Sequence, residues 1–169
     1  MGILSGNPQH EPLHYGEVYS LWTFVSGNQS KIACYQAYLN HAGDGDLRNL
    51  IADKINECKD EVAQVGEVLK LNGVALPPAP AEKPAADLES IPPGARFTDP
   101  EIAMALSVDT GAGLVMCSKI MAQSIREDIG AMFGKFHVKA AAYGLHLLRM
   151  QKEKGWLVPP PLHLSKDPE

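Results

Sequence analysis

Four segments of the chain repeat apolar residues in steps of three and four, the spacing that places side chains on one face of an α-helix. The repeats predict helices over about residues 12–42, 46–72, 99–123 and 125–154. The second stripe, for example, contains Leu47, Ile51, Ile55, Cys58, Val62, Val65 and Leu69. We therefore expect one all-α domain that spans residues 1–169 and ends in an extended tail over 155–169.

Polar residues at the segment ends support these helices. Asp44 and Asp46 are typical capping residues for the second helix. Thr98-Asp99-Pro100-Glu101 forms a capping box with proline in the first turn, which predicts the start of the third helix. Ser124-Ile125-Arg126-Glu127 has the same spacing and predicts the start of the fourth helix. Gly155 is expected to end it.

Residues 73–98 hold six of the thirteen prolines and show no helical period, so they predict an extended connection. The other two connections are short, which favours antiparallel neighbours. An extended segment of this length could run along the whole bundle and make the third helix parallel to the second. The expected fold is a ferritin-like four-helix bundle with one long crossover. The alternative is an up-and-down bundle with a loose excursion.

Composition narrows the classes of partner. The formal charge is -5 and no basic cluster follows a helix face, so we expect no nucleic-acid partner. Residues 102–122 are apolar enough to raise the question of a membrane span, but they contain Asp109 and Lys119. We interpret them as a buried helix and expect no membrane association. The N-terminal residues lack a signal-peptide pattern, which favours a cytoplasmic protein that is not secreted.

The three cysteines are too few and too scattered for a disulfide framework. Cys34, Cys58 and Cys117 all fall in helical segments, so we expect reduced thiols in the core.

A ferritin-like fold suggests a dinuclear iron or manganese centre, which requires Glu-x-x-His pairs and further glutamates that converge in the core. The sequence has no Glu-x-x-His, and the stripes of the second and fourth helices are apolar. Glu57, Asp60 and Glu61 flank Cys58 and are assigned to the solvated side of the second helix. We therefore expect no cofactor and keep iron or manganese as an alternative.

Two polar residues interrupt the other stripes. Asn28 lies in the first helix and Asp109 in the third. The favoured interpretation is a core polar pair that fixes the register of the helices, because a buried carboxylate requires a partner. Buried water and a mononuclear metal site at Asp109 remain alternatives. His14 and Glu17 share one helix face and form another possible metal site, with an exposed, unrelated pair as the alternative.

Three motifs resemble a known family. They are Glu17-Val18-Tyr19-Ser20-Leu21-Trp22, Gln123-Ser124-Ile125-Arg126-Glu127-Asp128-Ile129 and Lys154-Gly155-Trp156-Leu157-Val158-Pro159-Pro160-Pro161. They resemble ferritin-like helical-bundle proteins of spore-forming bacteria, which are described as spore coat proteins or left uncharacterised. The resemblance covers nearly the whole chain. It implies an intracellular bacterial setting, either cytoplasmic or spore-associated. It also implies other coat-type proteins as partners and a possible homodimer, but no known reaction.

Some of these motif residues also have a physical interpretation. Ser124, Arg126 and Asp128 are interpreted as a structural turn, with Asp128 at the positive end of the fourth helix and Arg126 paired to a carboxylate. Trp156 directly follows the helix stop and is expected to fold back over the last apolar turn. The leading hypothesis is a non-enzymatic structural or assembly protein. A ferritin-like metal-binding protein or metal-dependent oxidoreductase, and a small-molecule or partner-binding bundle, are the alternatives.

Overall fold

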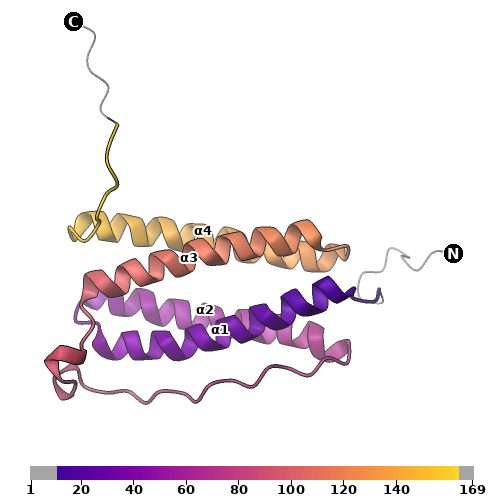
Figure 1. The fold of residues 1–169 in the computed structure, drawn as a ribbon, viewed down its shortest axis with the longest axis horizontal. Coiled ribbons are helices and arrows are strands. Elements are labelled where there is room, and N and C mark those ends of the chain that lie inside the picture. Colours follow the sequence, from indigo (N-terminus) through magenta and orange to yellow (C-terminus); the bar gives the residue numbers. More distant parts are fainter. Residues whose placement is uncertain (1–10, 164–169) are drawn as a thin grey trace, which may run out of the picture.

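The computed structural model describes residues 11–163, which form four long helices (Figure 1). These are α1 (Tyr15–His41), α2 (Gly45–Leu71), α3 (Asp99–Gln123) and α4 (Glu127–Glu153). Two short 3-10 turns, η2 (Leu88–Ser90) and η3 (Pro93–Ala95), lie in the connection between α2 and α3. Residues 11–163 contain no strand. The prediction of an all-α four-helix bundle is confirmed.

The long connection runs the length of the bundle beside the α1–α2 pair, from the end of α2 to the start of α3 (Figure 1). Side chains of α1 hold it in place. Gln36 Oε1 accepts a hydrogen bond from the Lys83 amide at 2.9 Å, and Asn40 bonds both Pro84 O and the Ala86 amide at 3.0 Å. Trp22 Nε1 donates to Ala75 O, near the start of the connection, at 3.1 Å. The crossover is therefore anchored, and α3 runs parallel to α2.

The ends of two helices match their sequence signals. Asp44 caps α2 by accepting hydrogen bonds from the amides of Asp46 and Leu47, both at 3.0 Å. At the start of α3, Glu101 Oε2 accepts from the Thr98 amide at 2.7 Å and from its hydroxyl at 2.8 Å. Each contact satisfies polar groups that a helix terminus leaves unpaired.

The capping box predicted at Ser124 is wrong. The Ser124 hydroxyl instead donates to Ile120 O at 2.7 Å and closes the last turn of α3. The N-cap of α4 is Arg126, and its side chain makes no capping hydrogen bond. Spacing alone could not separate the two arrangements, because the serine lies in the corner between α3 and α4 and can serve either helix.

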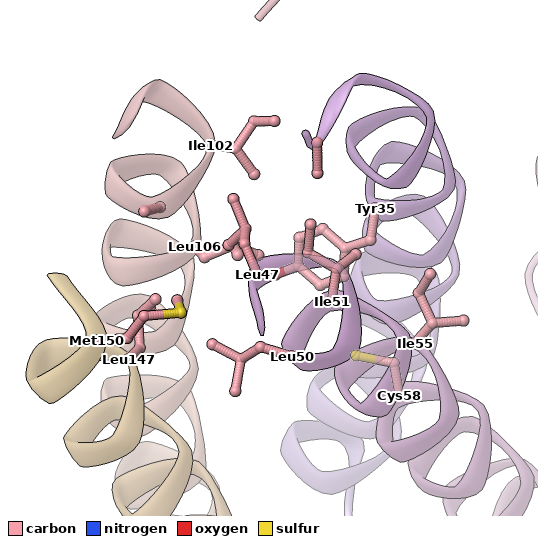
Figure 2. Close-up of a cluster of buried hydrophobic side chains, with 12 residues drawn as sticks. Tyr35, Leu47, Leu50, Ile51, Ile55, Cys58, Ile102, Leu106, Leu147 and Met150 are labelled. Atoms are coloured by element: carbon pink, nitrogen blue, oxygen red, sulfur yellow. The ribbon is translucent and has the colours of Figure 1, made fainter. Parts of the chain in front are cut away.

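The apolar core is divided into two clusters, one toward each end of the bundle. The first is drawn in Figure 2 and contains Tyr35, Ala42, Leu47, Leu50, Ile51, Ile55, Cys58, Ile102, Ala103, Leu106, Leu147 and Met150. The second contains Leu21, Phe24, Val25, Val65, Leu69, Cys117, Ile120, Ile129, Phe133 and Phe136. Here Phe24 meets Phe133 edge to face, with ring centroids 4.8 Å apart.

The inward face of α2 is less apolar than expected. Lys54 and Glu61 are buried, and the assignment of Glu61 to the solvated side is wrong. The reason is helical phase. Glu61 lies three residues after Cys58 and four before Val65, both buried, so it belongs to the same inward row.

Two further expectations of burial are wrong. Cys34 is exposed, whereas Cys58 and Cys117 are buried free thiols. Residues 93–123 contain a stretch long and apolar enough to cross a membrane by length and composition, but only 28% of it is buried within the bundle. The α3 helix therefore has one apolar face in the core and a second that is exposed.

Candidate functional site

A cavity of about 230 Å³ lies where the two apolar clusters meet. All four helices contribute to its wall. The lining residues are Thr23, Phe24, Gly27, Asn28, Lys31, Lys54, Cys58, Glu61, Asp109, Thr110, Ala112, Gly113, Met116, Cys117 and Ala140. The middle of a helical bundle is where such folds build ligand, cofactor and metal sites. The cavity is therefore the candidate functional site.

Asn28 and Glu61 join α1 to α2 at the cavity. Asn28 Nδ2 donates to Glu61 Oε2 at 2.7 Å, and the two residues are only 5% and 6% exposed. Burial raises the pKa of the Glu61 carboxyl above its ordinary value, because the charged form loses its hydration. Glu61 is thus a buried acid that favours its protonated form more than a surface glutamate does.

The predicted pair of Asn28 and Asp109 lines the same cavity, but each residue bonds a different partner. Asp109 Oδ2 accepts a hydrogen bond from the Tyr35 hydroxyl at 3.0 Å, and its carbonyl oxygen lies 3.4 Å from Lys31 Nζ. Asp109 is only half-buried. The polar contacts therefore bind α1 to α2 through Asn28, and α1 to α3 through Asp109.

Lys54 brings a positive charge into the interior. Its Nζ donates to Glu57 Oε2 at 2.9 Å and lies 4.9 Å from the centroid of the Tyr143 ring. Burial raises the pKa of Tyr143, so its phenol stays protonated. The ring face and the Glu57 carboxylate together compensate the ammonium for lost hydration.

The donor set does not fit a dinuclear iron or manganese centre. Within residues 11–163 no three His, Cys, Asp or Glu side chains are grouped so that they could hold a metal ion. Glu61 and Asp109 are separately bonded, and the cationic Lys31 and Lys54 line the same cavity. Two ammonium groups oppose the entry of a further cation, whereas a carboxylate–imidazole cage would attract one.

The possible metal pair of His14 and Glu17 is engaged in capping α1. His14 Nδ1 accepts from the amides of Gly16 at 3.0 Å and Glu17 at 3.3 Å, and Nε2 lies 3.1 Å from Gln123 O. This pattern assigns the proton to Nε2, because the carbonyl can only accept. Glu17 Oε2 accepts from the His14 amide at 3.1 Å, which completes a capping box.

Glu17 also holds the α3–α4 corner, and its side chain is fully buried. Its Oε1 accepts from the amides of Ile125 at 2.9 Å and Arg126 at 3.1 Å. Arg126 in turn forms a two-pronged ion pair with Asp128, at 3.0 and 2.6 Å, and donates to Glu11 O at 3.2 Å. The Arg126 guanidinium holds the pKa of Asp128 below its usual value. These contacts agree with a structural turn.

The two buried thiols lie on the cavity wall. Burial raises the pKa of Cys58 to about 12 and that of Cys117 to about 11, so both remain protonated at neutral pH. A protonated thiol is a poor nucleophile, and the cavity lining includes no histidine that could serve as its base.

Trp156 is half-buried and packs against the first apolar cluster. Gly155 takes a left-handed conformation with φ of 70°, and the Trp156 amide then bonds Gln151 O at 2.8 Å. This closes the end of α4 in the manner of a Schellman turn. Beyond Leu157 the described tail leaves the end of the bundle, with Val158 and Leu162 exposed (Figure 1).

Sequence reasoning did not find Lys54 and Glu61 as site residues. The available signal was their position on the inward row of α2, four residues before and three after Cys58. The inward position of Lys54 and Glu61 was missed because the apolar residues of α2 already form a complete stripe without these two.

The crossover topology and the polar cavity define a single-crossover four-helix-bundle protein with a charged, mid-bundle site. The chain belongs to a family whose model matches residues 1–168 and is described as "Protein of unknown function (DUF3231)". It is 58% identical to "Uncharacterized protein YvdQ" of Bacillus subtilis (strain 168) over 169 residues, which are 100% of this chain and 99% of the relative.

A solved structure also matches. It is the crystal structure of "a putative spore coat protein (BH2358)" from Bacillus halodurans C-125, which is 53% identical to this chain. The match has a TM-score of 0.93 and covers 94% of this chain and 100% of the other. A spore-coat-type role is thus associated with a close structural relative.

Proposed function

We propose that this protein is a non-enzymatic structural protein of the spore-coat type that assembles by self-association through α3. The observation that carries the proposal is the exposed apolar face of α3, formed by Met104, Val108 and Val115, whose exposed fractions are 47%, 64% and 70%. The similarity to a protein described as "a putative spore coat protein" supports the setting. The single crossover supports a shared origin with ferritin-like bundles.

The face has the properties of a surface that packs against its own copy. Met104, Val108, Gly111 and Val115 recur at helical spacing, so they form one stripe. Between residues 102 and 118 the only charged side chain is Asp109, which is bonded to Tyr35. A two-fold interface pairs each patch with itself, so a stripe without net charge avoids like-charge repulsion there.

An apolar groove of about 310 Å³ continues this face between α3 and α4. Its wall includes Met104, Gly111 and Leu114 of α3, Leu148 of α4 and Trp156 of the tail. Small residues such as glycine let a second helix approach closely, and the groove could receive side chains of a partner α3. The face and the groove share Met104 and Gly111, so together they form one continuous apolar surface. Contiguous apolar surfaces of this kind are typical of interaction sites.

Light scattering coupled to size-exclusion chromatography tests self-association. We expect a mass of twice the 18.3 kDa chain for the native protein, and a single-chain mass for the double variant Val108→Lys, Val115→Lys. Leu71→Lys is the matched control, because Leu71 is 84% exposed at the end of α2 and lies outside the face. A native protein with a single-chain mass would refute the assembly proposal.

The coat role requires a separate test in cells. Expressed with a fluorescent tag in a sporulating Bacillus, the protein is expected to collect at the surface of the developing spore and in the coat extract. The Val108→Lys, Val115→Lys variant is expected to remain diffuse. A native protein that stays in the soluble mother-cell fraction would overturn the coat role while leaving self-association intact.

The mid-bundle cavity favours a second candidate function, the binding of a small molecule. The side chains that line the cavity fit a small molecule better than a metal ion. Stoichiometric iron or manganese in protein purified without chelators would instead favour the metal-dependent alternative.

A further inference from the structure

The mid-bundle cavity contains polar groups that the protein itself does not satisfy. Asn28 uses its Nδ2 to bond Glu61 Oε2, which leaves Asn28 Oδ1 and Glu61 Oε1 without a hydrogen bond from any of residues 11–163. Both residues are more than nine-tenths buried. An acceptor that has no partner in the protein remains available to a ligand, so a molecule that donates hydrogen bonds at this point is favoured there.

The remainder of the wall suits an apolar body. Phe24, Met116 and Ala140 line the cavity, and the protonated thiols of Cys58 and Cys117 behave as small apolar groups. An apolar cavity of 150 Å³ is known to accept benzene, so about 230 Å³ accommodates one ring with a short substituent.

The charges on the wall limit the head group. Lys31 and Lys54 face the same cavity as Glu61 and Asp109, so the formal charges of the lining side chains balance. An anionic head would meet the two carboxyl groups, and a cationic head would meet the two ammonium groups. A neutral head group that can both donate and accept avoids both penalties.

We propose that the cavity is a binding site for a small, uncharged amphipathic molecule, with one ring or a short chain as its body. Its head is an alcohol that donates to Asn28 Oδ1 or Glu61 Oε1, or an amide whose NH₂ group donates to both. The head lies between α1 and α2, and the body lies against Phe24 and Met116. This site is independent of the exposed face of α3, so either can be wrong without the other.

Benzyl alcohol is a suitable probe, with toluene as the apolar control and benzoate and benzylammonium as charged controls. Binding is measured by chemical-shift titration of the labelled native protein. We expect saturable binding of benzyl alcohol with shifts at Asn28, Cys58 and Met116, and binding at least about tenfold weaker for the other three compounds. Equal or tighter binding of any control, or no binding of benzyl alcohol up to its solubility, would overturn the proposal.

Two variants locate the site. Gly113→Leu places a side chain in the cavity, where a Cβ would lie 3.9 Å from Lys31 Nζ, an ordinary contact. Gly130→Leu makes the same change in α4, outside both the cavity and the α3 face, where a Cβ meets nothing within 4 Å. Benzyl alcohol is expected to bind Gly130→Leu as it binds the native protein and to lose at least about tenfold in affinity for Gly113→Leu. Equal affinities of the two variants would place the ligand elsewhere.

Glu61→Met tests the head group, because methionine keeps the length of the side chain but removes the acceptor. The preference for benzyl alcohol over toluene is expected to fall from about tenfold to about twofold. A preference that stays unchanged in the folded variant would show that Glu61 does not receive the head group. If Glu61→Met does not fold, the comparison of the two glycine variants still decides the location.

Discussion

Glu17→Gln changes a fully buried carboxylate that joins the start of α1 to the α3–α4 corner. Glu17 Oε1 accepts from the amides of Ile125 and Arg126, and Oε2 accepts from the amide of His14. Glutamine keeps the shape, but one oxygen becomes an NH₂ group that faces an N–H donor. The variant therefore loses at least one charge-assisted hydrogen bond and leaves a buried amide unpaired.

The expected loss follows from these contacts. A hydrogen bond to a charged group contributes about 1.5–3 kcal/mol, and the remaining bonds to glutamine are weaker because the acceptor is neutral. We expect the free energy of unfolding to fall by about 2–3 kcal/mol for Glu17→Gln. Glu17→Ala removes all three acceptor contacts and is expected to cost about 4 kcal/mol, a large share of the stability of a typical domain.

Urea unfolding followed by circular dichroism measures the loss. Glu101→Gln is the matched control, because Glu101 closes the capping box of α3 in the same way but is exposed, so water can replace its contacts. A loss for Glu17→Gln no greater than that for Glu101→Gln would refute the reasoning. Stabilisation of the native protein by Zn²⁺ or Mn²⁺ that disappears in Glu17→Gln would instead favour the metal alternative at His14 and Glu17.

Three further predictions concern pH, the tail and the thiols. Burial raises the pKa of Glu61 in the folded state. The protonated Glu61 carboxyl therefore contributes to stability below its ordinary pKa, and this contribution is lost as pH rises through the folded-state pKa. Urea unfolding across this pH range should show a steeper loss of stability in the native protein than in Glu61→Gln. Trp156→Ala exposes part of the first apolar cluster and should lower the free energy of unfolding by about 2–3 kcal/mol, somewhat less than for a fully buried tryptophan, with a normal helical spectrum; an unchanged midpoint in urea would show that the tail packs without stabilising the bundle. A thiol reagent should label Cys34 rapidly in the folded protein, and Cys58 and Cys117 only on unfolding, because burial raises the pKa of Cys58 to about 12 and that of Cys117 to about 11; rapid labelling of all three would contradict this.

Local sequence signals were sufficient for the helices and their connectivity. The spacing of apolar residues, the capping groups at Asp44 and Thr98, and the proline content of residues 73–98 act over a few residues each. Such signals can be read without knowledge of the neighbours. The length of the proline-rich segment then predicted the crossover, because an extended chain of that size can span the bundle.

The candidate site could be predicted only in part, because the burial of a side chain depends on the neighbouring helix that packs against it as well as on its own helix. Asn28 was recognised as a polar residue in an apolar stripe, but its partner Glu61 was not, because it sits at the edge of a stripe that already looked complete. Asp109 was expected to meet Asn28, yet the rotation of α3 brings it to Tyr35.

The sequence by itself thus determined that four helices form, which connections are short and which side of each helix is broadly apolar. The tertiary structure alone decided which polar side chains share the cavity, that Ser124 closes α3 rather than α4, and how much of α3 stays exposed. The physical reason is that local structure follows from hydrogen bonds and side-chain sterics within one turn. Partners across the bundle are set by helix phase and packing, which depend on all four helices together.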